Sequence, residues 1–408
     1  MNLVSAETLL MIGCGLVILS YLFSMLSMVI RVPSVLLLLF AGVGFRFLAN
    51  TYDIDLELPA SLVETLGVVG LIMIVLEAGL DLKLSKEKSR LIRDSFFSAL
   101  VILVLSTGLL TGILYYWLHE PVQNCLAYAI PLSIMSSSIV IPSLHPLSEQ
   151  KKEFLVYEAS FSDILGILAF NYLLSGEQAG WKSLGIFSGS IVFSVILSLI
   201  LSFVLFFILA KTKLNIKFFL VFALLVLIYM GGKTLHLPSL IIIIVFGMMI
   251  KNWELLRIPW LQKLFPEEQV NSVRHLLHSI TAESSFLIRT FFFLLFGYTI
   301  QLKTLNNYDV VTVGSLIVVA LFLVRLLYLR FFVKTNVFPE SFLIPRGLVT
   351  IVLYYKIPEQ YRLNAFDEGI LFFIILTTAV IMTFGMIFYK KKPDQIIEES
   401  QFLDHSNH

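Results

Sequence analysis

Residues 32–42 read VPSVLLLLFAG and residues 237–247 read LPSLIIIIVFG, so one apolar pattern occurs twice in the chain. Three positions match at a constant offset of 205: Pro33, Ser34 and Gly42 correspond to Pro238, Ser239 and Gly247. A proline followed by an unbroken aliphatic run is typical of a helix that starts at an interface and enters hydrocarbon. The pair therefore indicates an internal repeat of membrane helices. The alternative is coincidence, because Pro-Ser before aliphatic residues is common at helix starts.

The composition of the whole chain agrees with a membrane protein. Of the 408 residues, 58% are hydrophobic and 14% are charged, with a mean hydropathy of +0.90, whereas soluble domains carry roughly 25% charged residues. The charge balance of 29 basic against 28 acidic residues argues against a nucleic-acid partner. Cys14 and Cys125 lie in apolar stretches without metal-ligand spacing, so neither a disulfide framework nor a transition-metal site is expected.

The predicted fold class is an all-α polytopic membrane protein with about thirteen transmembrane helices. Apolar runs between polar breaks place these helices at residues 8–30, 33–49, 61–82, 95–118, 123–145, 153–174, 184–210, 216–232, 238–251, 281–302, 309–333, 341–356 and 367–389. If the second helix corresponds to the ninth, two six-helix repeats (8–174 and 216–390) are joined by one connector helix (184–210). A single connector inverts the second copy, and inverted repeats are typical of secondary transporters.

Loop charges predict the orientation of this transmembrane domain, which spans residues 1–392. Loops on one side of the segmentation hold most of the lysines and arginines, among them Lys83, Lys151 and Lys211. The positive-inside rule then places the N-terminus outside a plasma membrane and the tail, residues 393–408, in the cytoplasm. Residues 264–280 mix charged and apolar positions and predict an amphipathic helix lying on the inner surface.

Two of the predicted helices carry residues that interrupt a helix in mid-membrane. The segment 123–145 contains Ser136, Ser137, Ser138 and Pro142, and the segment 341–356 contains Pro345, Arg346 and Gly347. Proline removes a backbone hydrogen bond and glycine loosens a helix, so both segments can expose carbonyl oxygens, which suit hard cations. The simpler explanation is that the serines permit close helix packing and that Pro142 only kinks its helix.

Few ionisable residues fall inside the predicted helices, and each is a candidate for function because burying a charge in hydrocarbon is unfavourable. Glu158 and Asp163 lie on one helix about 140° apart, so we expect separate roles for them. Arg346 is the expected partner of one carboxylate, because a buried guanidinium needs a bidentate acceptor. The other carboxylate can then hold either a proton or a cation. Purely structural roles, a hydrogen bond for Asp163 and a salt bridge between Glu158 and Arg346, remain open.

These motifs resemble those of bacterial sodium/proton exchangers in the cation:proton antiporter superfamily. The likeness rests on Glu158 and Asp163, on Arg-Gly-Leu-Val at residues 346–349, and on Glu-Ala-Gly-Leu-Asp-Leu at residues 77–82. It implies that Asp163 carries the cation and the proton, that Glu158 is salt-bridged to Arg346, and that the protein is a homodimer. Ser162 stands where the resemblance implies an asparagine, and serines in residues 135–140 replace a threonine-aspartate-proline motif, as in the potassium-efflux branch.

The sequence therefore predicts an antiporter, not an enzyme, that exchanges sodium, potassium or possibly lithium for protons, one for one. The expected ion-binding residues are Asp163, Ser162, Glu158, Ser136, Ser137 and Ser138. Glu77 is a possible part of the ion path, while Arg289 and Arg325 are expected to form structural pairs. No cofactor is expected, and the partners are membrane lipid, a second copy of the chain and a possible cytoplasmic regulator. A cation-coupled solute symporter or a channel remains as an alternative; an intramembrane enzyme would need a catalytic motif not found here.

Overall fold

The structure is a computed structural model, and part of the chain is described in it. The described residues are 6–30, 32–52, 60–85, 87–144, 146–174, 189, 192–204, 207, 218–234, 239–255, 267–299, 307–333, 337–363 and 366–389. The predicted tail, 393–408, and the outer parts of the predicted connector helix, 184–210, lie outside them.

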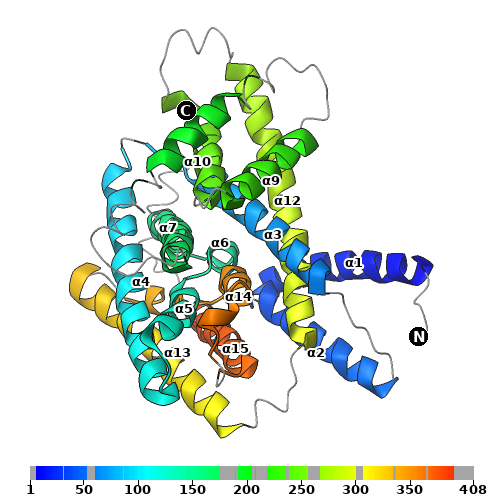
Figure 1. The fold of residues 1–408 in the computed structure, drawn as a ribbon, viewed down its shortest axis with the longest axis vertical. Helices are drawn as coiled ribbons and strands as arrows, with labels where there is room; N and C mark the ends of the chain where they lie inside the picture. Colours follow the sequence, from blue (N-terminus) through cyan, green and yellow to red (C-terminus); the bar gives the residue numbers. More distant parts are fainter. Residues whose placement is uncertain are drawn as a thin grey trace. The chain divides into compact units, whose positions relative to one another are not determined.

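The predicted all-α class is confirmed, since the described residues form helices and no strand. The α-helices are α1 (Ala6–Ile30), α2 (Ser34–Thr51), α3 (Ala60–Asp81), α4 (Ser89–Leu118), α5 (Val122–Ser133), α6 (Ser137–Ser143), α7 (Glu149–Leu174), α9 (Phe218–Thr234), α10 (Ser239–Lys251), α12 (Glu267–Thr299), α13 (Tyr308–Tyr328), α14 (Leu348–Tyr355) and α15 (Glu368–Phe388). Short turns accompany them: η1 (Trp253–Leu255), η3 (Leu329–Val333), η4 (Glu340–Phe342) and η5 (Glu359–Tyr361). Residues 192–204 form a further apolar helix, so each predicted range contains a described helix (Figure 1).

Local sequence signals explain several helix starts. Pro33 and Pro121 stand directly before α2 and α5, where the N–H that proline lacks would have had no partner in the helix. The side chains of Asn307 and Asp367 accept hydrogen bonds from the first turns of α13 and α15, at 3.1 and 2.7 Å.

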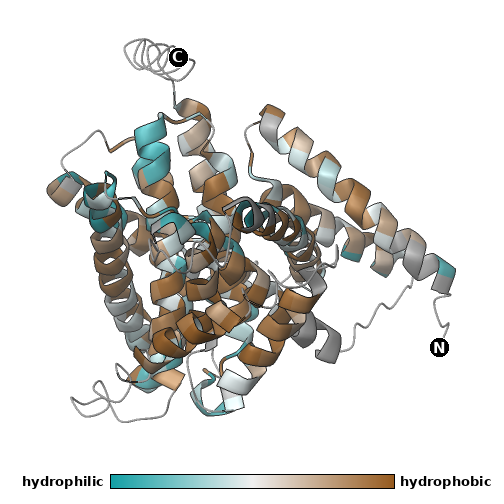
Figure 2. Cartoon of the chain, turned by 90° about the horizontal axis from the view of Figure 1, so that it is seen from above, coloured by the Kyte–Doolittle hydropathy of each residue, from teal (hydrophilic) through white to brown (hydrophobic). Residues whose placement is uncertain are grey.

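The described helices have the length and polarity of membrane spans. Six of them are long and apolar enough to cross a membrane, and four shorter apolar helices accompany them. Hydrophobic residues dominate the helices in Figure 2, and large apolar side chains such as Leu22, Tyr116 and Val319 are exposed where lipid would contact them. The chain is therefore a multi-pass membrane protein.

One predicted boundary is wrong. Residues 264–280 were expected to form a separate surface helix, with the next crossing at 281–302. The structure instead has one continuous helix, α12, over Glu267–Thr299. No proline or glycine stands between Glu267 and Phe296, so nothing in the backbone interrupts the helix where the polar residues give way to apolar ones.

The chain forms two compact units, and each contains segments from both halves of the sequence. The first comprises residues 1–56, 91–166 and 290–408, and the second comprises residues 57–90 and 167–289. In the first unit α2 crosses α12 closely, because a methyl group on Gly42 would overlap the Leu294 carbonyl and lie 3.0 Å from Cα of Gly297. Arg46 closes this crossing by donating to the carbonyls of Tyr298 and Thr299, at 2.8 and 2.7 Å.

The second unit contains a crossing of the same kind between α3 and α10. A methyl group on Gly79 would lie 2.6 Å from the Ile244 carbonyl and 3.2 Å from Cα of Gly247. Asn252 follows α10 and donates to the Leu82 carbonyl at 2.8 Å, just beyond the end of α3. Gly42 and Gly247 are the glycines that match in the sequence repeat.

Candidate functional site

The site is built where two interrupted helices meet, both within the first unit. The helix predicted over 123–145 breaks into α5 and α6, with residues 134–136 extended between them. The helix predicted over 341–356 becomes η4, an extended stretch and α14. The predicted interruptions are therefore confirmed, and α14 packs against α5 (Figure 1).

Direct contacts fix the two breaks to each other. The Ser136 N–H donates to the Pro345 carbonyl at 3.0 Å. Gly347 stands against Ser136, and a Cβ at this glycine would overlap the Ser136 hydroxyl. Only a residue without a side chain allows this approach. The first turns of α6 and α14 thus meet at the break.

Asp163 lies beside this junction on α7 and is 3% exposed. Its Oδ2 accepts a hydrogen bond from the Ser137 hydroxyl and a second, at 3.3 Å, from the Ser137 N–H. Its Oδ1 is buried without a hydrogen-bond partner, and no lysine, arginine or histidine among the described residues is ion-paired to it. A carboxylate held on one oxygen and open on the other is suited to binding a small cation or a proton.

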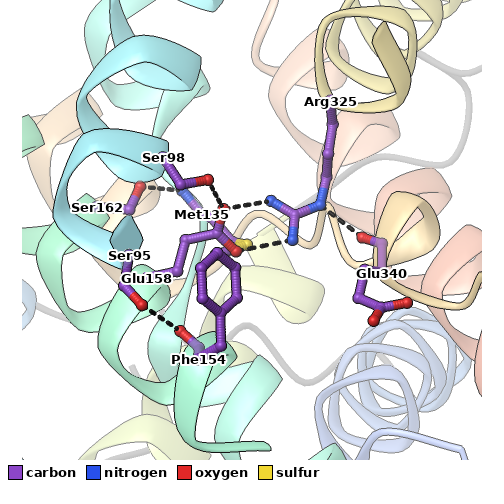
Figure 3. A network of polar contacts seen from close by, with 8 residues as sticks. All are labelled: Ser95, Ser98, Met135, Phe154, Glu158, Ser162, Arg325 and Glu340. Atoms are coloured by element: carbon purple, nitrogen blue, oxygen red, sulfur yellow. Dashed lines mark hydrogen bonds and ion pairs between the residues drawn. The ribbon is translucent and has the colours of Figure 1, made fainter. Parts of the chain in front are cut away.

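The predicted serines surround the same junction, with different tasks. The Ser162 hydroxyl accepts the Met135 N–H at 2.9 Å (Figure 3), so it satisfies a backbone donor that the break leaves without a helical partner. The hydroxyls of Ser136 and Ser138 are 2.9 Å apart. Of the four predicted serines, Ser137 contacts Asp163 directly, Ser136 and Ser138 contact each other, and Ser162 is engaged with the backbone.

Glu158 has a separate role, as its position on α7 predicts, but its partner is not the one expected. Arg325 on α13 holds both oxygens of Glu158, with nitrogen–oxygen distances of 3.3 and 2.9 Å (Figure 3). Ser98 on α4 donates to the same carboxylate at 2.5 Å. Glu158 and Arg325 are 1% and 2% exposed, so their ion pair is buried and fully hydrogen-bonded, which such a pair requires.

The predicted salt bridge between Glu158 and Arg346 is wrong. Arg346, which is 2% exposed, donates to the carbonyls of Leu132 and Ile344, at 2.6 and 2.8 Å. Leu132 is in the last turn of α5, whose carbonyls lack intrahelical partners, so the guanidinium caps this helix end. Glu158 faces α4 and α13 instead, and the arginine that α13 supplies there is Arg325.

The sequence did not predict the residues that surround the ion pair of Glu158 and Arg325. The Arg325 Nε donates to the Glu340 carbonyl at 2.6 Å (Figure 3), and the Glu340 carboxylate pairs with Lys151 at 2.5 Å. The expected structural pairing of Arg325 is seen, and Arg325 is the only cation within the 21 residues of α13. Glu340 and Lys151 lie near the ends of helices. Charged residues are common there, so their presence does not predict an ion pair.

Glu77 lies in the second unit. Its carboxylate is 3.7 Å from the Arg289 guanidinium, and Asp81, one turn further along α3, is 3.0 Å from His278. The expected structural pairing of Arg289 is thus seen, while a part for Glu77 in the ion path stays a prediction. Among the described residues, no group of three His, Cys, Asp or Glu side chains is arranged to hold a metal ion.

Comparisons with known proteins identify the family and the fold. A family profile described as "Sodium/hydrogen exchanger, transmembrane" matches residues 15–389. The fold is similar to the sodium proton antiporter MjNhaP1 from Methanocaldococcus jannaschii at pH 8, with a TM-score of 0.68 and 18% sequence identity over 92% of this chain and 99% of that one. An electron-microscopy structure of the same antiporter gives a TM-score of 0.63 and 18% identity over 95% and 100% of the two chains.

Among curated proteins, no sequence matches this chain. The structural likeness, at 18% identity, establishes the fold, and the profile covers nearly the whole chain. The predicted resemblance is confirmed: this chain belongs to the sodium/hydrogen exchanger family of transmembrane proteins.

Proposed function

We propose that this chain exchanges one monovalent cation for one proton across the membrane, with Asp163 carrying either ion in turn. Sodium, potassium and lithium are the candidate cations. The observation that carries the proposal is the state of Asp163, a buried carboxylate with one oxygen bound to Ser137 and the other without a hydrogen-bond partner. A buried carboxylate is stable only when neutralised, so a proton and a cation compete for it.

Oxygen atoms for a desolvated cation are close to this carboxylate. The hydroxyls of Ser136, Ser137 and Ser138 lie in the first turn of α6, and hydroxyl and carboxylate oxygens are ligands that hard cations prefer. Ser162 supports the same site by holding the Met135 N–H. A cation that leaves its hydration shell would therefore find replacement oxygens around Asp163.

The one-for-one stoichiometry is proposed from the arrangement of the two carboxylates on α7. Glu158 is neutralised by Arg325 through two hydrogen bonds, so exchanging its partner would leave a buried guanidinium uncompensated. Asp163 has no such partner among the described residues. One exchangeable carboxylate gives one cation or one proton per transport step.

We also propose that the chain is built from two inverted repeats and that transport occurs by alternating access between them. The two glycine crossings support it, because Gly42 packs on Gly297 as Gly247 packs on Gly79. Near each crossing a polar side chain donates to a carbonyl close to the end of the partner helix, Arg46 to Tyr298 and Asn252 to Leu82, although the two donors do not match in the sequence repeat. Equivalent contacts made by equivalent helices are expected when two copies of one fold are joined.

We also propose in which membrane the exchanger lies, its orientation and its oligomeric state. The loop charges favour a plasma membrane with the N-terminus outside and the C-terminus in the cytoplasm. The family resemblance favours a homodimer surrounded by membrane lipid, and a separate cytoplasmic protein could regulate it. Exchange for protons would serve pH and cation homeostasis.

Proton movement in proteoliposomes tests the proposal. Vesicles containing the purified protein receive a pH gradient, and sodium, potassium, lithium or choline is added in turn. We expect one or more alkali cations to collapse the gradient and choline to leave it intact. Asp163→Asn, which keeps the size of the side chain and removes its charge, should abolish the response.

Two results would contradict the proposal. If no alkali cation moves protons at any pH from about 6 to 9, or if Asp163→Asn behaves like the wild type, Asp163 is not a carrier. A cation-coupled solute symporter would then be the leading hypothesis, and a current that depends on an added solute would identify it. Cation flux that dissipates without proton movement would instead indicate a channel.

A further inference from the structure

Ser160 on α7 has a buried hydroxyl that forms no hydrogen bond. The residue is fully buried, and its Oγ has no hydrogen-bond partner among the described residues. Other buried hydroxyls in the helices of this chain bond to the carbonyl four residues earlier, Ser133 to Ala129 and Thr378 to Ile374, at 2.8 and 2.7 Å. Ser160 makes no such bond, so its hydroxyl is available to bind a ligand.

Ser160 is also the only polar neighbour of Asp163 along the surface of α7. The neighbours of a helical residue are those three and four positions away, and here they are Ala159, Ser160, Gly166 and Ile167. The Cβ atoms of such neighbours are about 5–6 Å apart. Side chains on a helix lean towards its N-terminus, so the Asp163 carboxylate extends over the turn that contains Ser160. The two side chains therefore lie next to each other on one face of the helix.

Each of these two side chains has an oxygen whose bonding capacity is unused. Oδ2 of Asp163 accepts both bonds from Ser137, whereas Oδ1 is buried without a hydrogen-bond partner, like Oγ of Ser160. Buried polar atoms normally have a partner, so two such atoms on one helix face indicate a ligand that bonds to both.

The missing hydrogen bond also indicates what kind of ligand fits. A hydroxyl within about 3 Å of a carboxylate oxygen would donate to it, so Oγ of Ser160 and Oδ1 of Asp163 are held further apart. Hard cations hold their oxygen ligands at roughly 2.3–2.6 Å, and one ion can therefore join two oxygens that are up to about 5 Å apart. A proton shared in a single hydrogen bond cannot span that separation.

We propose that Ser160 is a specificity-determining cation ligand, whose hydroxyl binds the transported cation together with Oδ1 of Asp163 but does not bind the transported proton. This inference rests on the proposed function, because it concerns the same carboxylate. A cation needs several oxygens to replace its hydration shell, whereas a proton needs one carboxylate oxygen. Removing the hydroxyl therefore weakens the binding of the cation and leaves the binding of the proton unchanged.

Ser160→Ala tests the inference, because it removes the hydroxyl and introduces a residue that favours a helix. The measurement is cation-dependent proton flux in proteoliposomes, over a matrix of cation concentrations and of pH values from about 6 to 9. The half-maximal cation concentration at alkaline pH reports the affinity for the cation. The pH below which this concentration rises reports the affinity for the proton. We expect the first quantity to increase about tenfold and the second to stay at the wild-type value.

Ser106→Ala is the matched control. Ser106 is also fully buried, and its hydroxyl also has no hydrogen-bond partner among the described residues, but it lies on α4 and not beside Asp163 on α7. Both quantities should equal those of the wild type in this variant. Calorimetric titration of the purified protein with the same cation at alkaline pH should show the loss of affinity in Ser160→Ala alone, without any transport step.

Three outcomes would overturn the inference. An unchanged cation affinity in Ser160→Ala would mean that the hydroxyl is not a ligand. A weaker affinity for the proton, with unchanged affinity for the cation, would show that Ser160 accepts a hydrogen bond from protonated Asp163 instead. An equal loss of cation affinity in Ser106→Ala would assign the effect to the removal of any buried hydroxyl. Failure of the proposed function would show separately, as a wild type that exchanges no alkali cation for protons.

Discussion

At the scale of single residues, Ser137 decides how strongly Asp163 holds its proton. Its N–H and its hydroxyl both donate to Oδ2, and such bonds stabilise the ionised carboxylate. In Ser137→Ala the hydroxyl bond is lost, so the proton competes better with the cation. We expect half-maximal exchange to move to higher pH by about one unit, measured as cation-dependent proton flux between about pH 6 and 9.

Ser143→Ala is a matched control for this prediction. Ser143 is also on α6, but its hydroxyl donates to the Ile139 carbonyl of the same helix, at 2.8 Å. The control should keep the wild-type pH profile. A profile that shifts equally in both variants would show that the change comes from α6 as a whole and not from the bond to Asp163.

The pair of Glu158 and Arg325 leads to a prediction about stability. Removing one partner of a buried pair leaves an uncompensated charge, so Arg325→Met should destabilise the protein by roughly 3–5 kcal/mol. The double variant Glu158→Gln/Arg325→Met should recover part of this loss, because neither charge remains. Equilibrium unfolding in detergent measures these two variants and Glu158→Gln, and a double variant as unstable as the sum of the two single changes would contradict a direct pair.

The sequence identified these residues better than it identified their partners. Asp163 and Glu158 could be separated because helical geometry alone puts them on different faces of α7. The partner of Glu158 could not be predicted, because α13 and the segment before α14 each offer a buried arginine. Which of the two reaches Glu158 depends on how the helices pack, and that is not encoded in local spacing.

At the scale of the helices, glycine residues allow two pairs of helices to cross at close distance. In Gly79→Ala the new methyl group would meet the Ile244 carbonyl at 2.6 Å, so α3 and α10 would have to move apart. We expect a loss of about 1–3 kcal/mol in unfolding free energy. Gly42→Ala should behave in the same way at the equivalent crossing, where the Leu294 carbonyl is the obstacle.

Gly108 provides the control for both crossings. It lies within α4, and nothing is within 4 Å of a Cβ built there, so Gly108→Ala should be neutral or stabilising by up to about 1 kcal/mol. Thermal unfolding of the three variants in one detergent would give the comparison. Three equal effects would mean that glycine acts here through helix propensity and not through contact.

Most helix ends were predictable to within a few residues, while α4 begins at Ser89, six residues before its predicted start, and α12 is longer than predicted. The break before Leu348 coincides with the predicted Pro345 and Gly347. The break at 134–136 lies at the predicted serines, whereas Pro142 is inside α6 and does not interrupt it. The continuity of α12 was missed because a change in polarity was taken as a helix boundary. No proline or glycine stands between Glu267 and Phe296 to interrupt α12.

At the scale of the whole molecule, competition at one carboxylate predicts how exchange depends on pH. If a proton and a cation exclude each other at Asp163, the cation concentration for half-maximal exchange rises as pH falls. Where the protonated form dominates, it should rise about tenfold per pH unit while the maximal rate stays constant. Initial rates over a matrix of Na⁺ concentrations and pH values check this. A maximal rate that falls instead would indicate a separate titrating group that switches transport off.

If Asp163 is the single ion carrier, it also determines how the exchange rate depends on membrane potential. With Glu158 held by Arg325, each cycle moves one positive charge in each direction, so no net charge crosses the membrane. An electrogenic exchanger gains or loses about 2.3 kcal/mol per net charge at 100 mV. We therefore expect Na⁺-driven proton flux in proteoliposomes to be the same at 0 and about −100 mV, a range set by a potassium diffusion potential and valinomycin. When added Na⁺ enters and protons leave, flux that slows at inside-negative potential would mean that more than one proton is exchanged per cation, and that a second carboxylate titrates during the cycle.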